Sequence, residues 1–175
     1  MTEADANEAE KRWADYNVRQ ESLRMLYPFG LDARDIEQRI ALGHSEAGAV
    51  KFLLANLAEG SPDLQKRQMA YFQLAVLADK ERQPFRELLT KRTLWQLLHL
   101  KRSSVKRVSI LTGGPGHACS RCVAKHGAVW GIDEALKVMP IPRARCTSRA
   151  IYSDKIGYCT CLWVADVSHP KTKAQ

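Results

Sequence analysis

The chain has few aromatic residues and no long apolar run. Aromatic side chains make up 7% of its 175 residues, so the stacking platforms that hold single-stranded nucleic acids cannot be abundant. The longest apolar stretch, residues 48–58, is interrupted by Lys51 and is shorter than the roughly 20 apolar residues of a membrane-spanning helix. The opening residues, MTEADANEAEKR, are acidic and lack the basic start and apolar stretch of a secretory signal. We therefore expect a cytoplasmic protein without a membrane partner, in a compartment where thiols stay reduced.

Several catalytic motifs are also missing. The sequence GGPG is not followed by the lysine and helix that a phosphate-binding loop needs. The only His-x-Glu, at residues 44–46, lacks the downstream Pro-Cys-x-x-Cys of a zinc deaminase. Asp133 and Glu134 fit the acidic first turn of a short helix. The sequence favours a non-enzymatic protein with no evident small-molecule substrate. A metal-dependent enzyme such as a nuclease, using His117, His126 or these two acids, is the alternative.

The formal net charge of +8 is unevenly distributed. Residues 1–60 hold 7 Lys and Arg against 11 Asp and Glu, whereas residues 81–175 hold 17 against 6. Such a basic half predicts a polyanionic partner such as nucleic acid, although a solubilising surface explains the charge equally well. The two groups of candidate contacts form one positive surface if the fold brings them together. They are Lys101, Arg102, Lys106 and Arg107, and then Arg143, Arg145 and Arg149.

The first hundred residues predict a helical unit of four to five helices, because their apolar residues recur at helical spacings between capping residues. A serine followed by proline is a strong start signal, since proline needs no hydrogen bond in the first turn. The expected helix starts are residue 5, Asp32, Ser45, Ser61 with Pro62, and Pro84, and the last helix should bury Phe85, Leu88, Leu89, Trp95 and Leu98.

Beyond Leu100 the pattern changes to short strands. Residues 105–111 alternate β-branched with charged side chains, which predicts a strand, and two more short strands are expected at Ala128–Trp130 and Tyr158–Val164. This irregular segment has little apolar mass, so it needs a staple. We expect a mainly α protein with a small zinc-stapled α+β module at its C-terminal end. The predicted parts are a helical domain at 1–100, a basic cysteine-rich zinc-binding module at 101–168 and a mobile tail at 169–175.

The five cysteines are spaced like metal ligands. Cys119 and Cys122 form a Cys-x-x-Cys pair, which is typically half of a tetrahedral zinc site. Cys146 stands alone, and Cys159 and Cys161 form Cys-x-Cys. Alternate residues of a strand point to the same side, so either of the last two can complete a four-thiolate site. We predict structural Zn²⁺ on four of these five. In one arrangement Cys119, Cys122 and Cys146 bind together with either Cys159 or Cys161. In the other, both Cys159 and Cys161 bind and Cys146 is the spare cysteine.

Other uses of these cysteines are less well supported. A redox pair would follow a strand in a βαβ unit, whereas this Cys-x-x-Cys follows a glycine-rich turn. The spacing matches neither ferredoxin pattern. His117 and His126 lie close enough in sequence to replace a thiolate, and we interpret His126 as an exposed loop residue.

The order of motifs in the C-terminal third resembles a known module. VKRVSIL is followed by CSRC, GAVWGIDEAL, PIP, a single cysteine and a closing CTC. Over residues 105–164 this is similar to the cysteine-rich C-terminal module of Mu-type phage minor head (head morphogenesis) proteins. That family tends to have histidine where this chain has the arginines before Cys146. The resemblance implies a metal knuckle on Cys119, Cys122, Cys146 and either Cys159 or Cys161.

Two functions follow as hypotheses. The first is a non-enzymatic, zinc-stabilised binding protein that contacts nucleic acid through its basic C-terminal half. The second, which the resemblance implies, is an assembly or scaffold protein of phage or prophage type whose partner is a protein assembly.

Overall fold

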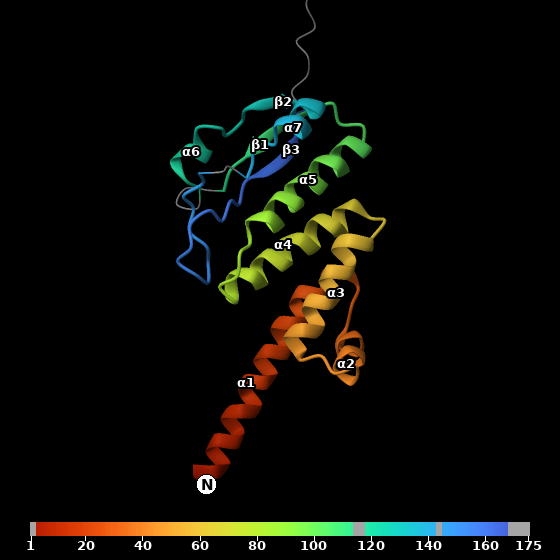
Figure 1. Ribbon diagram of the computed structural model, residues 1–175, viewed down its shortest axis with the longest axis vertical. Helices are drawn as coiled ribbons and strands as arrows, with labels where there is room; N and C mark the ends of the chain where they lie inside the picture. Colours follow the sequence, from red (N-terminus) through yellow and green to blue (C-terminus); the bar gives the residue numbers. More distant parts are fainter. Residues whose placement is uncertain (1–2, 114–117, 143–144, 168–175) are drawn as a thin grey trace, which may run out of the picture. The chain divides into compact units, whose positions relative to one another are not determined.

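The chain folds into helices followed by a small sheet. The computed structural model describes residues 3–113, 118–142 and 145–167. Figure 1 shows the helices and the three-stranded antiparallel sheet near the C-terminal end. The expected fold class, mainly α with a small α+β module, is confirmed. Within the described ranges, no helix combines the length and apolarity needed to cross a membrane.

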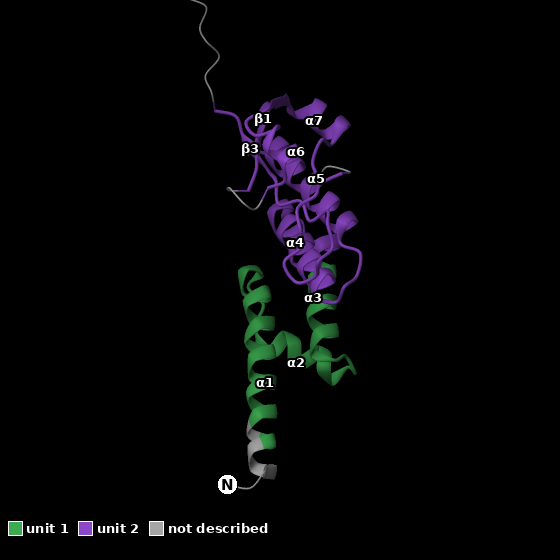
Figure 2. Ribbon diagram, turned by 90° about the vertical axis from the view of Figure 1, so that its left-hand side faces the viewer, with its two compact units in different colours: residues 1–56 green, residues 57–175 purple. Residues whose placement is uncertain are grey.

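Two compact units make up the chain, residues 1–56 and 57–175 (Figure 2). The boundary falls inside a helix. The first unit contains α1 (Glu3–Leu26), the 3₁₀ helix η1 (Tyr27–Phe29), α2 (Ala33–Ala41) and the beginning of α3 (Glu46–Gly60). Arg19 of α1 links these helices, because its guanidinium donates to Glu46 of α3 at 3.0 Å and to Glu37 of α2 at 3.3 Å.

The helix starts in this unit follow the predicted caps. The Asp32 side chain accepts a hydrogen bond from the Arg34 amide, and the Asp35 carboxylate accepts one from the Asp32 amide. This reciprocal arrangement is a capping box. At α3 the Ser45 hydroxyl accepts from the Gly48 amide at 3.2 Å. Both predicted helix starts are confirmed.

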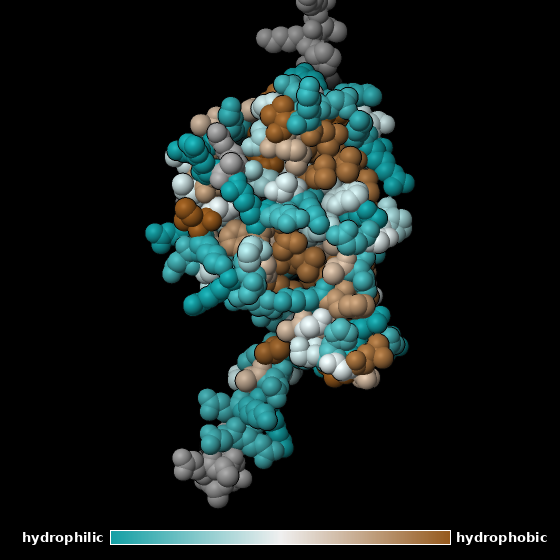
Figure 3. Space-filling model, viewed as in Figure 1, coloured by the Kyte–Doolittle hydropathy of each residue, from teal (hydrophilic) through white to brown (hydrophobic). Residues whose placement is uncertain are grey.

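The N-terminal part of α1 has a polar, exposed surface. Its described side chains before residue 19 are exposed, and Figure 3 shows the face of this stretch as hydrophilic. Trp13 remains 65% exposed and stacks on Tyr16, with 5.7 Å between ring centroids.

The second unit begins with an antiparallel pair of helices, α4 (Leu64–Lys80) and α5 (Arg86–Arg102). The N-cap of α4 is Asp63, whose side chain accepts hydrogen bonds from the amides of Gln65 and Lys66. The prediction that Ser61 caps this helix is wrong, because its hydroxyl accepts instead from the amide of Asp63. A carboxylate two residues further along thus takes the capping role.

A sheet of three short antiparallel strands lies beyond the helix pair. The central strand β1 (Arg107–Leu111) lies between β2 (Val129–Gly131) and β3 (Leu162–Ala165), with α6 (Ser120–Val123) and α7 (Ile132–Val138) in the connections. The strands predicted at 105–111 and 128–130 are present, but the first starts at Arg107 and the second runs from Val129 to Gly131. The predicted strand at 158–164 is only partly correct, because strand pairing starts at Leu162. Cys159 and Cys161 therefore precede the strand rather than lie on it.

The core of the sheet module includes α5. Leu97 of α5, Val108 and Ile110 of β1, and Trp163 of β3 are buried in one cluster together with all five cysteines. Gln96 of α5 also binds β3, since its amide donates to the Trp163 carbonyl at 2.9 Å and accepts from the Trp163 amide at 3.0 Å. The boundary expected near residue 100 would separate α5 from a core to which it contributes. The predicted tail at 169–175 lies outside the described residues.

Replacing Gln96 with alanine should destabilise the second unit. Two hydrogen bonds are lost and both backbone groups of Trp163 lose their partner, which costs about 1–3 kcal/mol. Urea denaturation followed by tryptophan fluorescence measures the change, with Gln65→Ala, an exposed position on α4, as the matched control. Equal stability of the two variants would show that the Gln96 bonds do not hold α5 to the sheet.

Candidate metal centre

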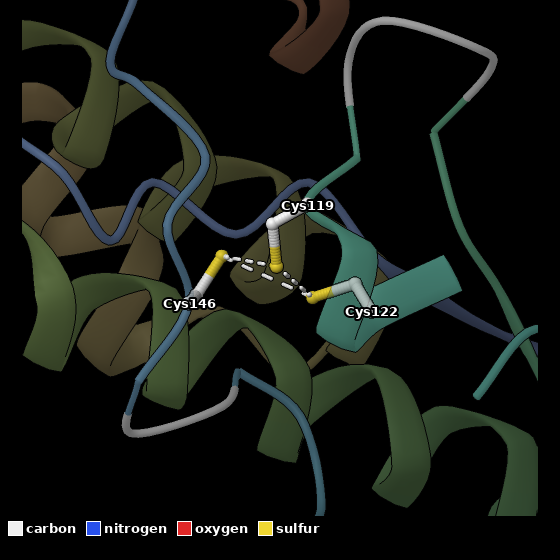
Figure 4. A group of neighbouring side chains, drawn as sticks. All are labelled: Cys119, Cys122 and Cys146. Atoms are coloured by element: carbon white, nitrogen blue, oxygen red, sulfur yellow. Dashed lines mark hydrogen bonds between the residues drawn. The ribbon is translucent and has the colours of Figure 1, made fainter. Parts of the chain in front are cut away.

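Five cysteines from three segments converge in the core of the second unit. Cys119 and Cys122 flank the start of α6, Cys146 lies in the loop after α7, and Cys159 and Cys161 lie just before β3. Their exposed fractions are only 1–8%. Figure 4 shows the first three side chains pointing toward one another. All five are free thiols.

The sulfur spacing fits a single metal ion. The Sγ atoms of Cys119 and Cys122 are 3.3 Å apart, and each lies 3.8–3.9 Å from the Sγ of Cys146. A tetrahedral ion with metal–sulfur distances of about 2.3 Å requires sulfurs roughly 3.8 Å apart. The two separations that involve Cys146 match this value, and the 3.3 Å between Cys119 and Cys122 is somewhat shorter.

The last two cysteines complete the cluster. Cys122, Cys159 and Cys161 form a second group whose sulfurs all lie within 4.8 Å of one another. Cys159 is also close enough to hydrogen-bond Cys146, and this contact affects its pKa. Cys122 belongs to both groups, so the five thiols form one continuous cluster that can bind a metal ion. Either group offers three sulfurs to one ion, so the geometry allows a set that includes Cys146 and also a set that includes both Cys159 and Cys161.

A tight turn sets the first pair. The carbonyl of Cys119 accepts from the amides of Cys122 and Val123, both at 2.9 Å, which folds the two sulfurs toward each other. The Cys119 amide donates to the Ser148 hydroxyl at 3.2 Å and thereby joins this turn to the Cys146 loop. Local hydrogen bonds therefore position two of the three cysteine segments before any metal binds.

A second backbone contact joins the Cys146 loop to the segment that contains Cys159. The Ser148 carbonyl accepts from the amides of Gly157 and Tyr158 at 2.9 and 3.2 Å. Gly157 has φ +103, and a Cβ on it would lie 3.9 Å from the Cys146 carbonyl oxygen. The positive φ favours glycine here, so this residue type is required for the turn that leads to Cys159.

The thiols differ in how readily they ionise. Burial acts to raise the pKa of Cys119, but hydrogen bonds from the Thr147 backbone and from Cys122 outweigh it and lower that pKa to about 6. Burial and the bond to Cys119 raise the pKa of Cys122 well above its usual value. The bond to Cys159, followed by burial, raises the pKa of Cys146 in the same direction. Cys119 is therefore the most readily ionised of these three thiols.

The structure adds one residue that the sequence analysis missed. Arg92 of α5 is buried, and its guanidinium lies 4.7 Å from the centre of the Phe72 ring. A charged residue three positions after the buried Leu89 and five before the buried Leu97 lies on the apolar side of the helix. This spacing was the signal in the sequence that could have identified Arg92 as buried. The predicted buried side of the helix contained Trp95 and Leu98 but not Arg92.

The histidine and acidic candidates lie outside the cluster. The Nδ1 of His126 lies 3.3 Å from the Thr112 amide and 3.1 Å from the Thr112 hydroxyl, and no metal-binding group in the described residues includes it. Asp133 lies in the first turn of α7, as predicted, and pairs with Lys101. The Lys101 ammonium lowers the pKa of this carboxyl. His117 lies outside the described residues.

The predicted basic residues form two separate groups. Lys101, Arg102, Lys106 and Arg107 lie at the end of α5 and the start of β1, whereas Arg145 and Arg149 flank Cys146. In Figure 1 the turn from α5 into β1 and the α6 region lie at opposite ends of the sheet module. Whether their side chains form one surface stays a prediction. Arg143 lies outside the described residues.

Metal binding should release protons and strengthen with rising pH. The raised pKa values of Cys122 and Cys146 mean that both thiols are protonated near pH 7.5, and a bound metal replaces these protons. We expect the logarithm of the zinc affinity to rise by roughly two or more per pH unit between pH 7 and 8. Competition with a chromophoric chelator at several pH values measures this slope. A slope clearly below two would show that Cys122 and Cys146 are not both ligands.

Comparisons of the chain with protein-family models, with curated proteins and with solved structures found no match. The argument for function therefore depends on the geometry and chemistry of the cysteine cluster and its surroundings.

Proposed function

We propose that the chain is a non-enzymatic, zinc-stabilised binding protein that contacts nucleic acid through the basic loops of its cysteine cluster. The observation that carries this proposal is the convergence of five buried thiols with tetrahedral sulfur spacing. Buried cysteines that are neither disulfide-bonded nor ligands are common singly, but five in one contact cluster from three segments are typical of a metal site.

Zinc fits this set of donors better than the other metals that thiolates bind. Four thiolates in a tetrahedron are the usual environment of structural Zn²⁺. An iron–sulfur cluster inserts several iron and sulfide atoms between its cysteines, which the 3.3–3.9 Å separations of Cys119, Cys122 and Cys146 leave no room for.

The expected role of zinc is structural. Four thiolates fill the coordination sphere and leave no open position for a water molecule. The cysteines also lie inside the hydrophobic cluster that contains Val108, Ile110 and Trp163. An ion at this position would hold the three segments together in the centre of the module.

The basic residues next to the cysteines support a polyanionic partner. Arg121 lies between the first two cysteines, Lys125 follows shortly after them, and Arg145 and Arg149 flank Cys146. The sulfurs of these loops lie within 4 Å of one another, so the cluster brings together two loops on which Arg121, Arg145 and Arg149 are exposed and Lys125 is half-buried. Such a group of positive charges suits phosphates.

The second basic group is less available. Lys101 pairs with Asp133 at 2.7 Å, and Arg107 pairs with Asp166 at 3.1 Å. These acids compete with phosphates for the same cations. We therefore place the contact surface at the cysteine loops and not at the start of β1.

Loss of a ligand should remove the metal and unfold the C-terminal part. We expect the full-length protein to bind one zinc ion per chain, and Cys119→Ser or Cys122→Ser to bind none, because metal binding and folding are coupled in small thiolate modules. Native mass spectrometry before and after a strong chelator measures this.

Two further variants and a control sharpen the assignment. Of Cys159→Ser and Cys161→Ser, the one that keeps zinc identifies the spare cysteine. Ser120→Ala, an exposed position between the first pair, should retain full metal content. Full zinc content in Cys119→Ser would refute the proposed centre.

Nucleic-acid binding should depend on the cysteine-loop cations. The triple variant Arg121→Gln, Arg145→Gln, Arg149→Gln should weaken binding to a fluorescein-labelled oligonucleotide and reduce the log–log salt slope by about two to three. The matched triple variant Lys101→Gln, Lys106→Gln, Arg107→Gln removes equal charge and should change the slope little. Fluorescence anisotropy in a salt series measures both, with zinc content checked in each protein.

The alternative assembly function makes a different prediction in the same experiments. Wild-type protein that shows no salt-dependent oligonucleotide binding, but forms a defined oligomer in native mass spectra, would favour the assembly alternative. The exposed Trp13 and Tyr16 pair on α1 would then be the first place to look for the contact.

A further inference from the structure

Residues 149–156 form a short hairpin that carries exposed apolar side chains. Its arms pair through a bridge between the two end residues, and the Ala150 amide donates to the Lys155 carbonyl at 2.9 Å. At its tip, Ile151 is 71% exposed and Tyr152 is 50% exposed. Exposed apolar residues are common on protein surfaces, so these two alone identify no function. The contacts that hold the tip in place carry the argument further.

A buried carboxylate holds the tip of the hairpin. Asp79 of α4 is fully buried, and its carboxylate accepts from the Tyr152 amide at 2.9 Å and from the Ser153 hydroxyl. The Lys155 ammonium donates to the carbonyl of Arg82, in the turn between α4 and α5 (Figure 1). Burial of a carboxylate is costly unless hydrogen bonds compensate it. This buried charge therefore fixes the backbone of a residue whose ring is exposed.

Positive side chains lie around Tyr152. The Lys80 ammonium lies 4.6 Å from the centre of its ring, a cation–π contact. Because Tyr152 is still half exposed, the ring has surface available for a second contact. Arg82 and Lys155, both exposed, line a hollow of about 420 Å³ together with Tyr152, and Asp154 also lines it. An aromatic ring next to cations is the combination that binds single strands, because bases stack on the ring and phosphates meet the cations.

The hairpin adjoins the proposed cysteine-loop surface. Arg149, one of the cations assigned to that surface, is the first residue of the hairpin. It lines a second hollow of about 330 Å³ together with Cys119 and Ile151. Ile151 lines the hollow at Tyr152 as well, so the two hollows are neighbours. A strand bound by the cations of the cysteine loops therefore has the Tyr152 ring within reach.

We propose, on the basis of the proposed nucleic-acid function, that the ligand is single-stranded and that one of its bases stacks on Tyr152. In a duplex the bases are paired and stacked on one another, whereas a single strand presents their faces to side chains. Arg82 and Lys155 contact the adjoining phosphates. The cysteine-loop cations supply the attraction for any nucleic acid, and the hairpin supplies the preference for an unpaired strand.

Oligonucleotide titrations of the full-length chain test the proposal. Fluorescence anisotropy is measured with fluorescein-labelled oligothymidine, alone and annealed to oligoadenosine. Tyr152→Ala should raise the dissociation constant for the single strand about 5- to 150-fold, the range for loss of one base–aromatic stack, and should change duplex binding little. Its log–log salt slope should match that of the wild type, because no cation is lost. Tyr152→Phe keeps the ring and should bind within a few-fold of wild type.

Two further variants serve as controls. Tyr27→Ala removes a tyrosine of the first unit that is 82% exposed, and it should bind the single strand as the wild type does. Tyr152→Leu keeps an apolar side chain without the aromatic ring and should bind about as weakly as Tyr152→Ala. The comparison of the Leu and Phe variants therefore tests stacking even if alanine destabilises the hairpin.

The outcomes distinguish this inference from the function on which it rests. Unchanged single-strand affinity in Tyr152→Ala would overturn the inference and leave the proposed function in place. Equal losses for single strand and duplex would also overturn it, because they indicate general damage to the surface. A defined oligomer that dissociates in Tyr152→Ala, with oligonucleotide binding unchanged, would assign the hairpin to a protein contact instead. Wild-type protein that binds neither oligonucleotide would refute the proposed function itself, and this inference with it.

Discussion

The meeting of five cysteine sulfurs in one buried cluster is the constraint on which the second unit depends. Around them lie only a few large apolar side chains from α5, β1, α7 and β3, and the three strands are five residues long or shorter. A sheet this small is marginal without further support. The cysteine segments lie in the connections between its strands, so a metal ion bound by the cluster would join connections that the sheet alone holds weakly.

Local features of the fold were predictable from sequence, and tertiary ones were not. The caps at Asp32 and Ser45 depend on neighbours within three residues, which sequence alone shows. Cysteine spacing likewise identified all five members of the cluster. The shorter β3 and the role of Gln96 depend on partners about 50 to 70 residues away, and no local pattern reports them. Ser61 does not cap α4, because Asp63, also a residue type that caps helices, lies closer to the start of the helix.

The place of α5 shows why composition misjudged the organisation of the chain. Its sequence is that of a helix, so it was grouped with the helices before it, while the change of pattern after residue 100 marked a change of secondary structure only. One face of α5 packs on α4 through Leu89. Leu97 enters the cysteine core and Gln96 binds both backbone groups of Trp163. The smallest segment that keeps the cysteine core intact therefore includes α5, and a fragment that begins at residue 101 would lack the helix that supplies Leu97 and Gln96 to it.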